Sequence, residues 1–236
     1  MHNRIDGEML VSDYSTLYLI VKSYHQPKCP ASFAERVPHE KIWLWPFIID
    51  SDLIEKGGPT LQDKGVISVY VAGPDGFSEA TRDFMDLRLL PWLRGLGVRV
   101  INPWEMTTSD EVMAVYGLPH GDERERRIDE LNMEIGRRNL ENGIIPCTFV
   151  IANLDGQEVD SGTASEIGAA AALGKRIYAR RSDFRLTGEV GAIVNVQVAY
   201  FVRLNGGSIS LTLADMQRRV EAYIDELKAA GFRTLA

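Results

Sequence analysis

Residues 151–178 read IANLDGQEVDSGTASEIGAAAALGKRIY, and this stretch carries the pattern that decides the fold. An apolar run ends in an acidic loop, and an alanine-rich helix is predicted from Thr163 to Leu173, where Gly174 stops it. A second apolar run, RIYAR at 176–180, predicts the next strand. Two strands separated by one helix indicate a βαβ unit, in which the strands lie parallel.

The same alternation continues on both sides of this unit. Further strands are predicted from short apolar runs at VISVYVAG (66–73), VRVIN (98–102) and CTFVIANL (147–154). Further helices are predicted from helical spacing of apolar residues at 77–96, 122–142 and 213–230, the last of them stopped by Gly231. The chain is therefore expected to form an α/β fold with a doubly wound parallel sheet. Ligands of such sheets bind beyond the carboxyl ends of the strands.

Residues 1–64 differ from the rest of the chain. They hold two apolar runs, Leu17–Val21 and IWLWPFII at 42–49, and Pro46 would place the second at a sheet edge. The segment EKGGPTLQDKG at 55–65 is typical of a linker. We therefore expect residues 1–64 to form an N-terminal appendage and residues 65–236 to form the main α/β domain.

Composition excludes several classes of function. A net charge of −7 and a pI near 5.2 disfavour binding to nucleic acid. No apolar run is long enough for a membrane span, and the N-terminus lacks the apolar core of a signal peptide. Cys29 and Cys147 are far apart, which argues against a disulfide framework and suits a reducing cytoplasm.

No cofactor or metal is predicted. The phosphate-binding patterns GxGxxG and GxxxxGK[ST] are both absent, so dinucleotide and Walker-type nucleotide binding have no support. The chain also has no cysteine–histidine cluster with zinc spacing. Ligand spacing is equally absent among the four histidines, which are His2, His25, His39 and His120.

The loop and helix start at 160–168 allow a purely structural interpretation. Thr163 and Glu166 fit the S/T-x-x-E capping box, in which the glutamate only caps the helix. Asp160 precedes a glycine-containing segment and would then be an ordinary turn residue. A carboxylate also favours a helix N-terminus electrostatically.

Four segments in order resemble the nucleoside 2-deoxyribosyltransferase family. They are VYVAGPDGF (69–77), NLENGIIPCTFVIANLDG (139–156), DSGTASEIG (160–168) with Gly174–Lys175, and VNVQVAYFVRLNGGSI (194–209). The resemblance implies a flavodoxin-like fold and an enzyme of nucleotide salvage. It would move a 2-deoxyribosyl group from one nucleobase to another, with a nucleoside and a free base as its small-molecule partners.

The resemblance also implies roles for three catalytic side chains. Glu166 would attack the anomeric carbon as a carboxylate nucleophile. Asp160 would orient the nucleophile and the sugar, with the 5′-hydroxyl as its partner. Tyr70 would donate a hydrogen bond to the glutamate, although a tyrosine packed in the core is the alternative.

Four further residues are candidates for binding the substrate. Phe77 would stack on a base and Asp75 would bind a base edge, unless both are ordinary loop residues. Gly162 permits close approach of a backbone. Asn139 stands where many family members have an aspartate that helps to protonate the base. An amide cannot act as an acid, so Asp75 or water would have to supply that proton.

The C-terminal segment implies an assembly. In the family it reaches into the active site of a neighbouring subunit, so Asn195 would bind the 5′-end of the sugar there. Gln197 departs from a residue that is often methionine. A strand-edge asparagine and a solvated glutamine are the alternatives. If the resemblance holds, the protein is a homo-oligomer, a dimer or higher, with shared active sites.

Three hypotheses for the function follow. The first is deoxyribosyl transfer, and the second is hydrolysis of a nucleoside or nucleoside 5′-monophosphate by the same glutamate. The third is a nucleotide-sensing or partner-binding module without catalysis. Asp160 favours a free nucleoside, because an ionised carboxylate cannot donate to a phosphate. Arginines that would offset this repulsion are Arg137, Arg138, Arg180 and Arg181.

Overall fold

The computed structural model describes residues 65–186 and 191–235. The predicted appendage at residues 1–64 lies outside the described residues. Within the described ranges, no helix is both long and apolar enough to cross a membrane.

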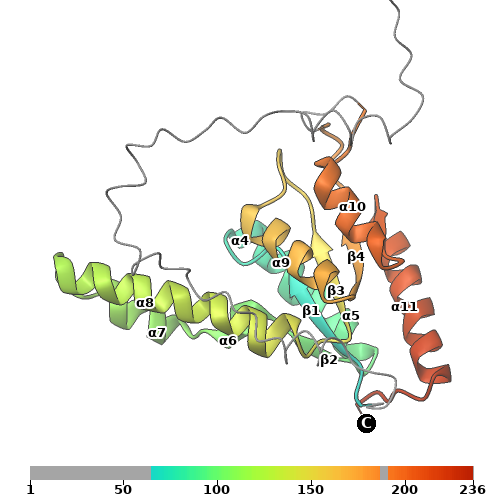
Figure 1. Ribbon diagram of the computed structural model, residues 1–236, viewed down its shortest axis with the longest axis horizontal. Helices are drawn as coiled ribbons and strands as arrows, with labels where there is room; N and C mark the ends of the chain where they lie inside the picture. Colours follow the sequence, from blue (N-terminus) through green and yellow to red (C-terminus); the bar gives the residue numbers. More distant parts are fainter. Residues whose placement is uncertain (1–64, 187–190, 236) are drawn as a thin grey trace, which may run out of the picture. The chain divides into compact units, whose positions relative to one another are not determined.

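A five-stranded parallel sheet forms the centre of the described domain (Figure 1). Its strands are β1 (Ser68–Ala72), β2 (Arg99–Ile101), β3 (Phe149–Asn153), β4 (Arg176–Arg180) and β5 (Ser208–Ser210). They lie in the order β2-β1-β3-β4-β5, and every neighbouring pair is parallel. This is the strand order of flavodoxin-like proteins. The predicted doubly wound α/β fold is confirmed.

Helices connect all of these strands. They are α4 (Glu79–Phe84), the π-helix η1 (Met85–Leu89), α5 (Leu90–Gly95), α6 (Pro103–Met106), α7 (Ser109–Tyr116), α8 (Asp122–Arg138), the π-helix η2 (Asn139–Ile144), α9 (Ser161–Ala172), α10 (Val196–Leu204) and α11 (Leu213–Ala229). The helices predicted at 77–96, 122–142, 163–173 and 213–230 are confirmed within a few residues. The short α6, α7, α10 and β5 were not predicted.

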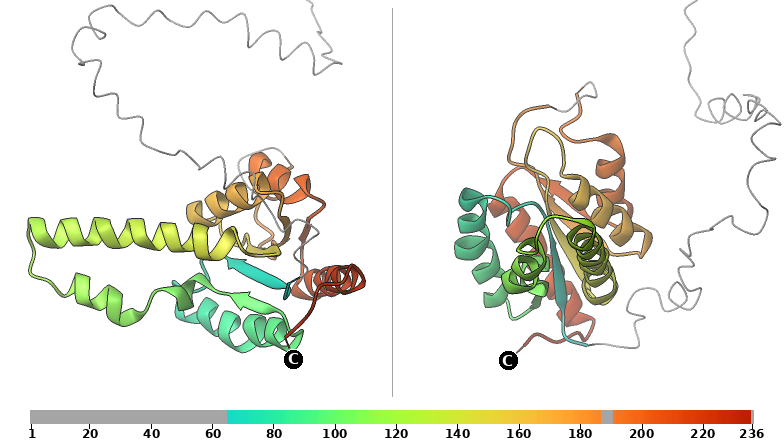
Figure 2. Two further views of the ribbon diagram at one scale, coloured as in Figure 1. Left: turned by 60° about the horizontal axis from the view of Figure 1, so that its bottom comes forward. Right: turned by 90° about the vertical axis from the view of Figure 1, so that its left-hand side faces the viewer.

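Two apolar cores pack on opposite faces of the sheet. On one face, side chains of η1, α5 and α11, such as Leu93 and Val220, pack against β1 and β3. On the other face, side chains of η2, α9 and α10, such as Ile167 and Val202, pack against β1, β3 and β4. Figure 2 shows this layered arrangement. Strands covered on both faces need apolar residues at consecutive positions, as at 69–72 in β1 and 149–152 in β3, where every residue is buried.

The helical pair α7 and α8 leads back to the sheet. The two helices pack side by side (Figure 2), and α8 continues directly into η2, which packs against α9. This connection brings the C-terminal part of α8 to the carboxyl ends of β1 and β2. It is the region where the sequence predicted a ligand site.

Candidate active site

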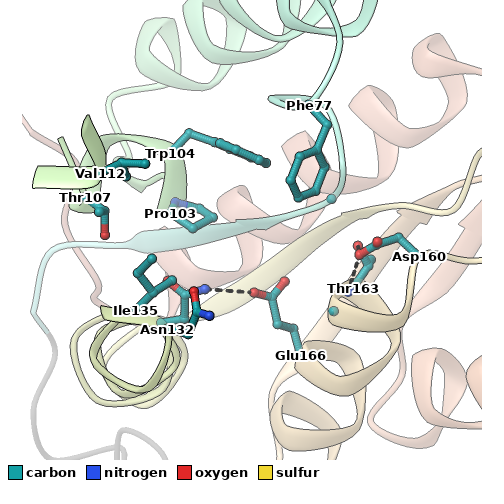
Figure 3. A pocket seen from close by; sticks show the side chains of 13 residues that line it. Phe77, Pro103, Trp104, Thr107, Val112, Asn132, Ile135, Asp160, Thr163 and Glu166 are labelled. Atoms are coloured by element: carbon teal, nitrogen blue, oxygen red, sulfur yellow. Dashed lines mark hydrogen bonds between the residues drawn. The ribbon is translucent and has the colours of Figure 1, made fainter. Parts of the chain in front are cut away.

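A cavity of about 400 Å³ opens at the carboxyl ends of β1, β2 and β3 (Figure 3). The loops after these strands and the inner face of α8 form its walls. The described lining residues are Gly73, Phe77, Pro103, Trp104, Thr107, Val112, Asn132, Ile135, Asn139, Asp160, Gly162, Thr163 and Glu166. Its position agrees with the expectation for a doubly wound sheet.

Glu166 lies on α9 and points into this cavity (Figure 3). The hydroxyl of Tyr70, from the buried strand β1, donates to its Oε1 atom at 2.6 Å. The amide of Asn139, the first residue of η2, donates to the same oxygen at 3.4 Å. Three residues that the sequence singled out on separate elements therefore meet at one carboxylate.

The capping-box interpretation of Glu166 is wrong. The residue that caps α9 is Asp160, whose Oδ2 atom accepts from the backbone N–H of Thr163 at 2.9 Å and from its hydroxyl at 3.0 Å. Thr163 is therefore inside the helix, and Glu166 lies farther along, away from the free N–H groups. Asp160 both caps the helix and lines the cavity.

Burial changes the acid–base properties of this cluster. Desolvation raises the pKa of Glu166 to about 7, and the nearby charge of Asp160 adds to the increase. The hydrogen bonds from Tyr70 and Asn139 stabilise the carboxylate and oppose the shift. Burial, with the charge of Glu166, raises the pKa of Tyr70 far above its ordinary value, so its hydroxyl remains a donor.

The π-helix η2 makes room for the Tyr70 ring. A Cβ atom at Gly143 would lie 2.6 Å from Cε2 of that ring, so only glycine fits here. The C-terminal end of η2 is anchored from the other side, because the buried Nζ of Lys175 donates to the carbonyls of Ile145 at 2.8 Å and Cys147 at 2.7 Å. Lys175, part of the segment at 174–175, thus anchors the end of η2 that packs beside Tyr70, and it is not among the described cavity-lining residues.

Two aromatic side chains form the wall of the cavity opposite Glu166 (Figure 3). The rings of Phe77 and Trp104 meet edge to face, with centroids 4.6 Å apart. Phe77 was predicted as a stacking residue and does line the cavity. The sequence analysis missed Trp104, which follows β2. An aromatic residue directly after a predicted strand of such a sheet was the signal that could have identified it.

The inner face of α8 supplies lining residues that the sequence analysis also missed. Asn132 and Ile135 line the cavity together with Asn139. Their spacing places them on one face of a helix. Given a helix at 122–142 with Asn139 at the site, helical spacing alone could have predicted that Asn132 and Ile135 lie on the same face.

Asp75 does not belong to the described cavity lining. It is buried, and its Oδ1 atom accepts from the amide of Asn153 at 2.7 Å. Burial raises its pKa, and the hydrogen bond from Asn153 opposes that shift. Asp75 therefore braces the loop after β1. Gly162, by contrast, lines the cavity, and a Cβ atom there would lie 3.2 Å from Oδ2 of Asp160.

Asn195 and Gln197 lie at the start of α10. The side chain of Asn195 accepts from the backbone N–H groups of Gln197 at 3.0 Å and Val198 at 3.4 Å, and so caps this helix. The interpretation of Asn195 as a strand-edge residue is wrong. Gln197 is exposed, and neither residue is among the described lining of this cavity.

A sequence model of the family described as nucleoside 2-deoxyribosyltransferase matches residues 69–225. The match spans the described cavity lining, from Gly73 to Glu166. No curated protein sequence matches the chain.

Several solved structures are similar to the chain. A conserved protein from Enterococcus faecalis V583 is 22% identical, with a TM-score of 0.49, over 67% of this chain and 99% of that one. A 2-desoxiribosyltransferase from Leishmania mexicana is 20% identical, with a TM-score of 0.45, over 66% and 98%. A 2-deoxyribosyltransferase from Bacillus psychrosaccharolyticus is 20% identical, with a TM-score of 0.41, over 72% and 99%.

Proposed function

The chain belongs to the nucleoside 2-deoxyribosyltransferase family, and we propose that it transfers the 2-deoxyribosyl group of a 2′-deoxynucleoside to another nucleobase through a covalent bond to Glu166. The observation that carries the proposal is the position of Glu166. Its carboxylate lines the cavity and is held by Tyr70 at 2.6 Å. A partly buried, oriented carboxylate suits nucleophilic attack on an anomeric carbon.

The first half-reaction breaks the bond between sugar and base. Both described hydrogen bonds to Glu166 go to Oε1, so we assign the attack to Oε2. This oxygen bonds to C1′ as the C1′–N bond breaks. The electron pair of that bond leaves with the base nitrogen, which takes up a proton. The product is a glycosyl ester on the face of the sugar opposite the departing base.

The second half-reaction reverses these steps with a different base. A ring nitrogen of the incoming base attacks C1′, and the ester bond to Glu166 breaks. The carboxylate is restored, and the incoming nitrogen loses its proton to water. Because each displacement inverts C1′, the product keeps the β-configuration of the substrate.

Protonation of the leaving base is assigned to water. Asn139 has no acidic proton to give. Asp75, the other source that the sequence suggested, is buried against Asn153 and does not line the described cavity. Water reaches an open cavity of this kind without a dedicated acid. Asn139 instead supports the Glu166 carboxylate.

The sugar end of the cavity favours a free nucleoside over a 5′-monophosphate. Asp160 can accept a hydrogen bond from a 5′-hydroxyl but repels a phosphate. No arginine, lysine or histidine is among the described lining residues. The arginines that would offset the repulsion are engaged elsewhere, Arg137 and Arg138 with glutamates, Arg180 with Asp155, and Arg181 with backbone carbonyls.

A comparison of donors tests this assignment of Asp160. Deoxyadenosine is expected to be a better glycosyl donor than its 5′-monophosphate, and Asp160→Ser should narrow that difference. If the wild-type protein uses the monophosphate at least as well, Asp160 does not select the 5′-end. A 2′-hydroxyl withdraws electrons from the oxocarbenium-like transition state, so we also expect 2′-deoxynucleosides to be preferred over ribonucleosides.

We further propose that active sites are shared between subunits. By family resemblance, Asn195 and Gln197 of one subunit would face the cavity of another. Both residues lie at the start of α10, outside the described cavity of their own chain. Mixing inactive Glu166→Ala and Asn195→Ala proteins should restore activity once subunits exchange. Proven exchange without any recovery would refute the shared site.

Base exchange tests the proposed function as a whole. The purified protein is incubated with a 2′-deoxynucleoside, with and without a second free purine or pyrimidine base, and the products are separated by chromatography. We expect a new deoxynucleoside that forms only when the second base is present. Release of free deoxyribose at the same rate with or without that base would instead favour the hydrolase.

A further inference from the structure

A second cavity, of about 490 Å³, borders the candidate active site. Trp104, Thr107 and Val112 line both cavities. The second cavity extends between the helix pair α4 and η1 and the segment that carries α6 and α7. Its apolar lining includes Met85 and Met113, and its polar and charged lining includes Arg82, Asp86, Asn102 and Glu105.

Trp104 is held between these two cavities by its neighbours. Asn102 caps α6, and its Oδ1 atom accepts from the backbone N–H of Trp104 at 3.2 Å. The indole ring lies against the loop after β1, where a Cβ atom at Gly76 would be 2.1 Å from the ring atom Cδ2. The same ring meets Phe77, the next residue of that loop, edge to face. The position of the indole therefore depends on the absence of a side chain at Gly76.

The ring faces the region where a nucleobase would lie. Figure 3 shows Trp104 and Phe77 on one side of the cavity, with Asn132, Ile135 and Glu166 across from them. A sugar bonded to Glu166 would place its base between these walls. The indole then lies between the base and the second cavity.

From this arrangement, and resting on the proposed function, we infer that Trp104 limits the size of the nucleobase by closing a substituent subsite. That subsite is the second cavity. The ligand chemistry that suits it is an apolar group carried on the exocyclic amine of a purine. Met85, Val112 and Met113 offer apolar contact for such a group.

The test compares two acceptor bases, adenine and N6-benzyladenine, with 2′-deoxyinosine as the donor. The measured quantity is the ratio of kcat/KM for the benzylated base to kcat/KM for adenine. We expect Trp104→Ala to raise this ratio by at least about tenfold over the wild type. An unchanged ratio would overturn the inference.

Two further variants test whether a change in this ratio comes from Trp104 itself. Phe77→Ala removes the other ring of the pair, but Phe77 is described as lining only the first cavity. It should therefore weaken both bases alike and leave the ratio near its wild-type value. Gly76→Ala keeps the indole of Trp104 but should displace it, and should therefore also raise the ratio. A ratio that rises as much in Phe77→Ala as in Trp104→Ala would contradict the role of the second cavity.

A binding measurement separates this inference from the proposed function. Isothermal titration calorimetry of adenine and N6-benzyladenine with the wild-type and Trp104→Ala proteins requires no turnover. A gain of at least about tenfold in relative affinity for the benzylated base supports the subsite, even if no sugar is transferred. A different outcome is that the wild type transfers sugar to adenine while the ratio of the affinities for the two bases is the same in both proteins. In that case the subsite inference fails and the proposed function stands.

Discussion

The two walls of the cavity differ in how their side chains are held. On one wall, Glu166 accepts a hydrogen bond from Tyr70, a fully buried residue of β1. The Tyr70 ring in turn packs against Gly143 of η2. On the other wall, the Phe77 side chain is 73% exposed and Trp104 is 37% exposed. The first wall is part of the core of the domain, whereas the second projects from surface loops.

Under the proposed function, this difference separates two tasks. A carboxylate that attacks carbon must be held within a fraction of an ångström, and only packed elements hold a group that firmly. A surface that accepts more than one flat base needs contact area and tolerates adjustment. We therefore expect changes in the buried wall to alter rate and pH dependence, and changes in the exposed wall to alter the choice of base.

Glu166→Gln should have the largest effect on rate. The amide keeps the size of the side chain but removes the nucleophile, so transfer should fall by at least about 10⁴-fold. Base exchange measured by chromatography gives the rate. Glu158→Gln, which removes an exposed carboxylate just before α9, is the matched control and should retain activity. Near-normal turnover in Glu166→Gln would contradict the claim that the buried wall, through Glu166, determines the rate.

The pH dependence of kcat/KM should show the ionisation of Glu166. Since burial raises its pKa to about 7, the carboxylate is mostly protonated below that pH and cannot attack. Activity should therefore fall about tenfold per pH unit below 7, to roughly one hundredth at pH 5. A profile that stays flat between pH 5 and pH 8 would show that Glu166 is not the titrating group.

Tyr70→Phe tests the hydrogen bond that holds Glu166, the proposed nucleophile. Loss of a hydrogen bond to a charged group should lower kcat about 10- to 100-fold. Because that bond lowers the pKa of Glu166, its removal should also move the acidic limb of the pH profile to higher pH. Gly143→Ala should produce a smaller shift in the same direction by displacing the Tyr70 ring. Changes in KM alone, with an unmoved acidic limb, would contradict the positioning role.

A further predicted effect is a gain in stability in Glu166→Gln. The folded protein retains the Glu166 proton between pH 4.5 and about 7, whereas the unfolded chain releases it, so this group destabilises the fold as pH rises through that window. The full cost is about 3 kcal/mol above pH 7. Thermal melts should show the variant more stable than the wild type at pH 8 and similar at pH 4. An equal or lower Tm at pH 8 would contradict the cost of burying this charge.

Most of the buried wall could be predicted from the sequence. Tyr70, Asn139, Asp160 and Glu166 each lie in a segment that combines a strand or helix signal with a family resemblance. The alternation of strand and helix was also sufficient to predict the doubly wound sheet. Local spacing alone misassigned the helix cap, because the S/T-x-x-E pattern at Thr163 competes with an aspartate that begins the helix earlier.

The exposed wall was harder to predict. Trp104 follows a strand of only three residues, and the short helices α6 and α7 carry little periodicity. Its position after a strand marks Trp104 as a candidate, but whether the side chain packs inward or lines a cavity depends on a neighbour from another loop, here Gly76, which the local sequence does not show. Asp75 was a candidate for binding a base edge, but in the structure it is buried and accepts a hydrogen bond from Asn153, a pairing that the sequence does not show.

The most direct test of the account is to look for the sugar on Glu166. The protein is mixed with a 2′-deoxynucleoside in the absence of a second base, quenched with acid within the first turnovers, and examined by mass spectrometry of the intact chain and its peptides. We predict a mass increase of one deoxyribosyl group on the peptide that contains Glu166, which disappears when a free base is added before the quench. Active enzyme with no such adduct, or an adduct on another residue, would contradict a glutamate nucleophile at this position.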